Sequence, residues 1–453
     1  MPSRHGVRLR VSVPPFVLVA FLSADVRAAR QQPPTDAVDC PADSYYEGRI
    51  VSPEEVERGT VPPSASFWWG VGWPCRKILG GMERGLIAFE ETKLREKLYD
   101  FQRRLAEAGF RPLFGGLGEG SGIGLGTIYD YPHRTTDALH VMGRVSLLTG
   151  YQEFSANFDK SLFGRTRLNL LADYQWRPNE PFYGFGQESS YDDRANFGLR
   201  QSSFSFHWDQ DVYTRIRSGV IYSAALLDSV DKSGGGRPPV SESFGPLAGL
   251  DERVNLQSIG AYVALDGYRG DYRLGGRSQI GASWQESWGE PEVRYARIEA
   301  MIEGRLPLVG ERTVLIGQAR TDMLREGSGT SPIPFYLLPR IGGSATLRGF
   351  PLDRFYGRNM ILTTIEYRFL IHPNMEVEIF HDSGQIYEHT HNLSFFDWQR
   401  NYGVGFRLRS ATGTQFRFEL ASSSEGVSAH FTFGDRPIRA LGSGPVRYPL
   451  YRP

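Results

Sequence analysis

The sequence has neither an excess of charge of one sign nor long apolar runs. Its 453 residues include 51 Lys and Arg and 51 Asp and Glu, so the formal net charge is zero. This balance gives no indication of a nucleic acid or an acidic substrate as partner. Beyond the N-terminus, no stretch reaches the run of about 20 apolar residues that a spanning helix needs. A helical membrane protein is therefore disfavoured.

Cysteine is also scarce. Cys40 and Cys75 are the only two, and both lie in the polar segment that follows the N-terminus. In an oxidising compartment such a pair can close a disulfide. Two free thiols are an equal possibility, because the sequence gives no distance between them. No histidine pair accompanies them, so we predict no metal site there.

Alternation of apolar and polar residues begins at about residue 110 and is typical of β-strands. We predict sixteen strands, at residues 110–121, 122–131, 138–148, 151–162, 165–176, 195–208, 212–226, 256–265, 278–286, 293–303, 312–323, 361–371, 375–387, 402–409, 414–420 and 426–433. Residues 228–252, rich in Gly, Pro and Ser, are predicted to be a long loop. The mean hydropathy of −0.35 does not argue against a membrane barrel, because barrel strands are apolar only at alternate positions.

A glycine-rich loop at residues 338–350 contains one cation, Arg348, followed by Gly349 and Phe350. Such a cation needs an anion, and two candidates follow at short range. Glu366 lies on the polar face of the strand predicted at 361–371, and Asp382 lies on the polar face of the strand predicted at 375–387. The alternative is that Arg348 is a surface turn residue and that the two acids are ordinary pore-facing charges.

Three motifs in this order resemble the C-terminal signatures of the BamA/TamA-type outer membrane barrels, also called the bacterial surface-antigen superfamily. They are Leu-Arg-Gly-Phe at 347–350, Ile-Glu-Tyr-Arg-Phe at 365–369 and Phe-His-Asp-Ser-Gly-Gln-Ile-Tyr at 380–387. The resemblance implies an all-β fold, a sixteen-stranded antiparallel transmembrane β-barrel at residues 110–434 in the bacterial outer membrane. It also implies that Arg348 pairs with Glu366 and Asp382 in the lumen and anchors a loop there.

The N-terminal region carries two further predictions. Residues 1–28 have a basic start, a short apolar run and small residues near Ala28, and are interpreted as an export signal; an apolar strand or anchor is the alternative. Residues 29–109 form a periplasmic segment, in which Leu94, Leu98, Phe101 and Leu105 mark an amphipathic helix. This helix packs at the periplasmic end of the barrel or in its lumen, or else forms a short coiled coil.

The segment at residues 29–109 has no evident POTRA domain, the small α/β module that usually precedes barrels of this family. The resemblance is therefore to a POTRA-less branch. The strand at 426–433 ends in an aromatic residue, as the insertion signal of such barrels does, and residues 435–453 form a C-terminal tail rich in Pro and Arg.

Signatures of catalysis are missing. The sequence has no Gly-x-Ser-x-Gly elbow. His381 and Asp382 are neighbours on a strand and point to opposite faces, so they cannot pair. A barrel phospholipase would need a lipid-facing Ser/His pair, and none is identified. His389 and His391 lie in a predicted loop with few carboxylates nearby. We therefore predict no catalytic residue, no enzyme activity, no metal and no cofactor.

Two classes of function remain. One is an outer membrane biogenesis or translocation protein, whose partners are outer membrane lipid and client outer membrane proteins or periplasmic proteins. The other is a passive pore or structural surface antigen without insertase activity. The retained loop chemistry favours the first class, and the absence of POTRA domains favours the second.

Overall fold

The computed structural model describes residues 44–46, 49–51, 104–105, 108–115, 120–131, 137–268, 274–308, 312–372, 374–389, 392–394, 396–410 and 413–433. The chain divides into two compact units, residues 21–108 and residues 1–20 with 109–453. In the first unit, β1 (Ser44–Tyr46) and β2 (Arg49–Val51) pair antiparallel. The predicted export signal, Cys40, Cys75 and the tail at 435–453 lie outside the described residues. So does the predicted helix, apart from Arg104 and Leu105, which are helical.

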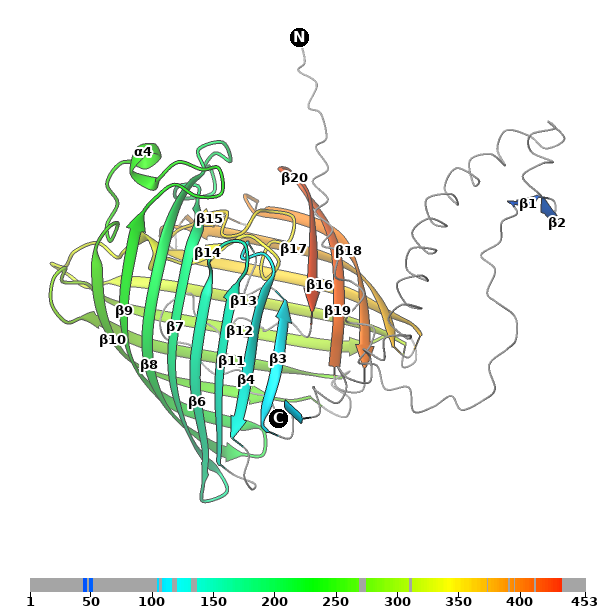
Figure 1. The fold of residues 1–453 in the computed structure, drawn as a ribbon, viewed down its shortest axis with the longest axis horizontal. Coiled ribbons are helices and arrows are strands. Elements are labelled where there is room, and N and C mark those ends of the chain that lie inside the picture. Colours follow the sequence, from blue (N-terminus) through cyan, green and yellow to red (C-terminus); the bar gives the residue numbers. More distant parts are fainter. Residues whose placement is uncertain are drawn as a thin grey trace, which may run out of the picture. The chain divides into compact units, whose positions relative to one another are not determined.

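The second unit is built on one antiparallel sheet of 16 strands (Figure 1). The strands are β3 (Phe110–Gly115), β4 (Gly124–Tyr131), β5 (Asp137–Ser146), β6 (Gln152–Leu162), β7 (Thr166–Phe182), β8 (Ala195–Tyr213), β9 (Ile216–Asp231), β10 (Arg253–Asp266), β11 (Gly275–Ser287), β12 (Arg294–Pro307), β13 (Thr313–Glu326), β16 (Asn359–His372), β17 (Met375–Tyr387), β18 (Gln399–Ser410), β19 (Gly413–Ser423) and β20 (Gly426–Phe433). Each strand pairs with the next along the chain, and β13 pairs with β16. The predicted all-β, sixteen-stranded antiparallel transmembrane barrel is confirmed.

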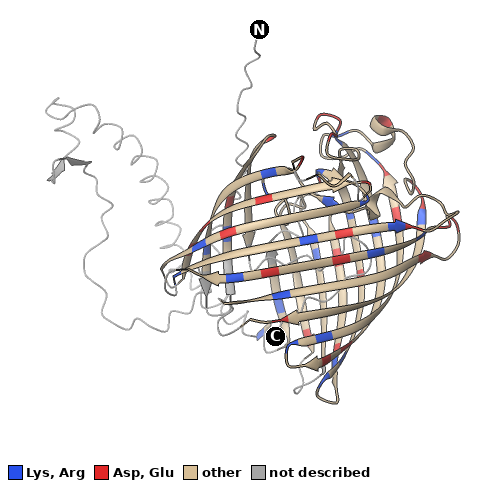
Figure 2. Ribbon diagram, turned by 180° about the vertical axis from the view of Figure 1, so that it is seen from behind, with Lys and Arg blue, Asp and Glu red and all other residues tan. Residues whose placement is uncertain are grey.

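Side chains alternate along each strand, so that the barrel has an apolar outer face and a polar inner face. On β10, Ile259 and Val263 are exposed, whereas Ser258, Tyr262 and Asp266 are buried. An exposed apolar face is stable only against lipid, so the exposed row marks the membrane side. Figure 2 shows acidic and basic residues recurring along the strands, consistent with a charged lumen. No helix among the described residues is long and apolar enough to cross a membrane.

Several strands differ in length from their predicted bounds. β7 continues to Phe182 rather than ending at residue 176, and β8 continues to Tyr213 rather than to 208. The extension of β7 contains Pro178 and Pro181, which hide the strand pattern. The structure accommodates this stretch with a register shift between Arg177 and Glu180, which fits the rule that proline in sheets is confined to edges and bulges.

The main apolar core lies where the extended strands β7, β8 and β9 meet two connecting loops. The predicted loop at 228–252 contains a short helix, α4 (Val240–Phe244). The connection from β13 to β16 contains the 3₁₀ helix η2 (Phe335–Leu337). In this core the ring of Phe182 packs edge to face on two other rings. Its centroid lies 5.0 Å from that of Phe335 and 5.1 Å from that of Tyr356. The core therefore fixes both loops against the end of the barrel.

The two edges of the sheet are formed by β3 and β20, which are only 6 and 8 residues long. Among the described residues, no strand pairing joins β3 to β20. Figure 1 shows the sheet curling so that the ends carrying these strands turn toward each other. Glycine at 115, 120, 122 and 124 gives the chain around the β3–β4 turn little side-chain surface to pack. Among the described residues, the seam between β3 and β20 therefore lacks the backbone hydrogen bonds that join the other neighbouring strands.

Candidate functional site

Residues 327–358, which connect β13 to β16, fold back into the barrel and are named the lumen loop here. Within it, β14 (Arg340–Ile341) pairs with β15 (Phe355–Tyr356). Leu347 and Phe350 are fully buried among apolar side chains of β16 and β17. A Cβ at Gly349 would lie 2.5 Å from the Cβ of Asn401 on β18, so only glycine allows the loop this close to the wall.

Arg348 lies at the centre of the site and is fully buried. Its Nε and Nη2 donate to the two carboxylate oxygens of Asp382, at 2.8 and 2.7 Å. Its Nη1 donates to Glu366 at 2.9 Å and to Glu419 at 2.8 Å. The guanidinium also stacks over the Phe380 ring, with Cζ 3.3 Å from the ring centroid. One cation of the loop thus binds carboxylates on β16, β17 and β19.

The carboxylates around Arg348 have further partners. Asp382 accepts hydrogen bonds from Thr364 and from the side chain of Asn401, both at 2.9 Å. Glu366 pairs with Arg368, Glu378 pairs with Arg407 at 2.6 Å, and Glu419 pairs with Arg417 at 3.1 Å. Four arginines therefore face four carboxylates. A buried cluster that is neutral and hydrogen-bonded costs much less to desolvate than one with an unpaired charge.

The electrostatics of Arg348 follow from this arrangement. Burial lowers the pKa of its guanidinium, but Asp382, Glu366 and Glu419 outweigh burial and hold that pKa well above the ordinary value. The cation is therefore permanent. The site works as a fixed electrostatic anchor for the loop.

Backbone groups of the lumen loop contact the last two strands as well. The carbonyl of Arg348 lies 2.7 Å from Nε2 of His430 on β20. The carbonyl of Gly349 accepts a hydrogen bond from Ser423 at the end of β19, at 2.7 Å. Arg354 donates to Glu425, in the turn that joins β19 to β20, at 2.8 Å. The loop is thus attached to the edge strand at the seam.

The structure places all five predicted anchor residues together. Arg348 contacts Glu366 and Asp382 directly, Gly349 lies against β18, and Phe350 fills the apolar cluster beside them. The sequence did not reveal Glu419, Glu378 or Asn401 as partners. Alternation placed Glu419 on the polar face of its strand, but its partner can be found only once the curvature of the sheet is known.

A second buried ion cluster lies in the lumen on β12 and β13. Arg297 donates through Nε to Asp322 at 2.9 Å and lies 3.7 Å from Glu299. Both partners face inward on strands whose alternation was predicted. The charges were visible in the sequence, but nothing there distinguished them from other pore-facing residues.

The two histidines of the predicted loop after residue 387 are only partly described. His389 lies in the loop after β17, and His391 lies outside the described residues. Among the residues that the structure describes, no group of His, Cys, Asp and Glu could hold a metal ion.

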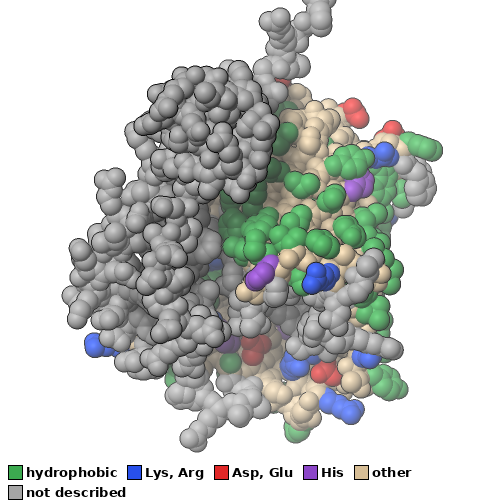
Figure 3. All heavy atoms as spheres, turned by 90° about the vertical axis from the view of Figure 1, so that its right-hand side faces the viewer, with side chains coloured by type: hydrophobic (Ala, Val, Ile, Leu, Met, Phe, Trp, Pro, Cys, Tyr) green, Lys and Arg blue, Asp and Glu red, His purple; other side chains and the backbone are tan. Residues whose placement is uncertain are grey.

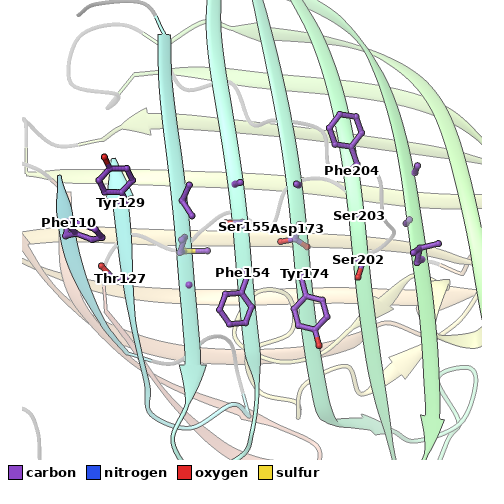
Figure 4. A pocket seen from close by; sticks show the side chains of 18 of the residues that line it. Phe110, Thr127, Tyr129, Phe154, Ser155, Asp173, Tyr174, Ser202, Ser203 and Phe204 are labelled. Atoms are coloured by element: carbon purple, nitrogen blue, oxygen red, sulfur yellow. The ribbon is translucent and has the colours of Figure 1, made fainter. Parts of the chain in front are cut away.

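An apolar depression crosses the outward faces of β4 to β9, between the rings of Phe154, Tyr174 and Phe204 (Figure 4). It offers surface to lipid and no cluster of reactive groups.

One contact of His381 was not identified in the sequence. Alternation excluded a pair between His381 and Asp382, and no Ser/His pair was found on this strand. In the structure Ser383 Oγ lies 2.9 Å from His381 Nε2. Residues two apart on a strand share a face, so the spacing itself was the signal.

Fold and site together define a class, a transmembrane β-barrel whose lumen is occupied by an arginine-anchored loop. Residues 260–434 match the family described as the Omp85 superfamily domain. This match includes the lumen loop and every member of the Arg348 cluster. This region thus matches the superfamily of the BamA/TamA-type barrels, which the three sequence motifs resemble.

A solved structure shows the same fold at low identity, and two others are similar at lower TM-scores. BamA from Haemophilus ducreyi lacking POTRA domains 1–3 is 14% identical, with a TM-score of 0.50 over 73% of this chain and 76% of that chain. CdiB from Escherichia coli is 11% identical, with a TM-score of 0.48 over 71% and 61%. CdiB from Acinetobacter baumannii is 12% identical, with a TM-score of 0.43 over 70% and 54%. No curated protein matches the chain significantly.

Proposed function

We propose that this protein resides in the bacterial outer membrane and acts in outer membrane biogenesis or in translocation of protein or lipid. The observation that carries the proposal is the attachment of the lumen loop to the edge strand β20. Carbonyls of the loop accept hydrogen bonds from His430 on β20 and Ser423 on β19, while Arg348 is held by carboxylates on β16, β17 and β19. A loop connected in this way can determine whether the seam is closed.

The mechanism follows from the geometry of the wall. β3 and β20 share no strand pairing among the described residues, so opening the seam breaks few backbone hydrogen bonds. The unpaired edges of β3 and β20 can then add a strand of a client, because an exposed edge is a template for β-augmentation. The partners of this activity are outer membrane lipid and client outer membrane proteins or periplasmic proteins.

Conductance in planar bilayers tests the proposal. Purified protein should give small, flickering currents, because the lumen loop occupies the pore. The Arg348→Ala variant should enlarge them, since the loop loses its central anchor. Arg358→Ala is the control, because this arginine of the same loop is exposed and pairs with Glu326 and Glu388 at the surface.

Large, steady channels that Arg348→Ala leaves unchanged would instead identify a passive pore and refute control by the loop. If the currents respond as expected, the next measurement is insertion of an unfolded outer membrane protein into liposomes that contain the wild type or the variant. Equal insertion rates with and without the protein would exclude a role in biogenesis.

A further inference from the structure

The outer face of β17 carries a histidine and a serine at neighbouring outward positions. Phe380 and Asp382 point into the lumen, where both contact Arg348. His381 and Ser383 therefore point outward. Their cross-strand neighbours confirm this direction, since Ile365 on β16 is 53% exposed and Tyr402 on β18 is 63% exposed. Figure 3 shows histidine side chains among apolar ones on the outer surface of the barrel.

The geometry of this pair fixes the tautomer of the histidine. Nδ1 of His381 lies 3.1 Å from the backbone carbonyl of Asn401, which can only accept a hydrogen bond. Nδ1 therefore carries the proton, and Nε2 of the neutral ring is an acceptor. Ser383 Oγ, 2.9 Å away, donates its hydroxyl proton to Nε2. This is the arrangement that a general base needs in order to activate a serine.

Two contacts hold the imidazole in this orientation. Its ring stacks on that of Tyr402, with centroids 4.4 Å apart and an interplanar angle of 27°. The Asn401 carbonyl is positioned in turn, because the side chain of Asn401 is hydrogen-bonded to Asp382 in the lumen. The base is thus oriented by a group that is itself fixed, which is the logic of a catalytic triad.

The pair lies where the outer face changes from apolar to polar. Toward the periplasmic turns, the outward residues of β16, β17 and β18 are apolar, and Ile365, Ile379 and Val404 are more than half exposed. Toward the lumen-loop end, the next outward residues are Thr363, Ser383 and Arg400. Aromatic and amphipathic side chains mark such a boundary in membrane barrels. It is also the depth at which the ester bonds of glycerolipids lie, between acyl chains and headgroups.

We propose that Ser383 and His381 hydrolyse an acyl ester of a membrane glycerolipid. Ser383 Oγ attacks the ester carbonyl carbon while its proton passes to Nε2 of His381. The bond from carbon to the glycerol oxygen then breaks, and that oxygen takes the proton from Nε2. Water hydrolyses the acyl-serine with Nε2 again as base, so the products are a fatty acid and a lysolipid. Arg400, directly opposite Ser383 and exposed, is the cation on this face that meets the developing negative charge or the lipid phosphate.

Labelling with a long-chain fluorophosphonate, carried out on the full chain in detergent micelles, tests the nucleophile. It also tests access, because Ser383 is only 7% exposed. Wild type should be labelled and Ser383→Ala should not, while His381→Gln should slow labelling by at least about 100-fold, the usual contribution of a general base. Ser422→Ala is the matched control, because Ser422 is an outward serine whose strand neighbours are Tyr402 and Val427 and not a histidine. Equal labelling of wild type and Ser383→Ala would overturn the proposal.

Hydrolysis then identifies the lipid. Vesicles of phosphatidylethanolamine, with or without lipopolysaccharide, are incubated with wild type, Ser383→Ala and Ser422→Ala, and the released fatty acids and lysolipids are measured. We expect release from phosphatidylethanolamine by wild type and Ser422→Ala only, whereas release from lipopolysaccharide alone, whose acyl chains are not attached to glycerol, would refute the glycerolipid substrate. Release that persists in Ser383→Ala, or no release by wild type from either lipid, would refute the activity. Mobility on unheated gels verifies that each variant is a folded barrel.

Discussion

Removal of Arg348 is the most informative perturbation of the lumen. The side chain is fully buried and donates four hydrogen bonds to three carboxylates. In Arg348→Ala, three arginines remain to face four carboxylates, so one buried negative charge loses compensation. Breaking a buried ion pair by removing one partner typically costs about 3 to 5 kcal/mol. We expect a loss of this size in the free energy of unfolding.

Urea unfolding in micelles, followed by mobility on unheated gels, measures this loss. Arg358→Ala serves as control, because an exposed ion pair contributes at most about 1 kcal/mol. Similar stability changes in the two variants would show that the cluster is not an anchor. A double variant, Arg348→Ala with Asp382→Asn, adds a sharper criterion. If the pair is coupled, the second substitution costs less in the Arg348→Ala background than in wild type.

Three further predictions concern the contacts of the lumen loop. Gly349→Ala should destabilise the barrel by about 1 to 3 kcal/mol through overpacking, whereas Gly304→Ala, whose Cβ would meet nothing within 4 Å, should leave urea unfolding unchanged. His430→Ala removes the hydrogen bond to the loop carbonyl, so amide exchange in β20 should accelerate while exchange in β10 stays constant; equal acceleration in both strands would contradict a local attachment. Burial raises the pKa of Glu425 above its ordinary 4.5, although Arg354 opposes the shift. The folded state therefore binds this proton more tightly, and the stabilisation from protonated Glu425 is lost as pH rises through the raised pKa. Glu425→Gln should flatten this decline in the free energy of unfolding with pH. An unaltered dependence of the unfolding free energy on pH would exclude this contribution of Glu425.

The sequence predicted the barrel well because its signal is local. Strand alternation has a period of two residues, and each strand repeats it independently. The predicted strand ends were wrong where proline hid the alternation. In β7, Pro178 and Pro181 lie at a bulge, and the strand continues through them. The short helix α4 was hidden inside a stretch whose glycine and proline content indicated only a loop.

The site was predictable only in part, for a geometric reason. Arg348, Glu366 and Asp382 come from a loop and the two strands that follow it, so three motifs close in the sequence were sufficient. Glu419 binds the same guanidinium from β19, 71 residues along the chain. Only the curvature of the sheet brings that strand round to face the loop, and no local pattern encodes this curvature.

Residues of β17 and β18 connect the two faces of the wall at a single point. Asp382 faces inward and binds Arg348, while His381 and Ser383, on either side of it, face outward. Asn401 joins them, because its side chain donates to Asp382 in the lumen and its carbonyl accepts from His381 at the lipid face. Displacement of the lumen loop would remove Arg348 from Asp382, which would keep its hydrogen bonds from Thr364 and Asn401. The lumen cluster and the lipid-facing histidine are therefore connected by contacts of one residue, Asn401, across the thickness of the sheet.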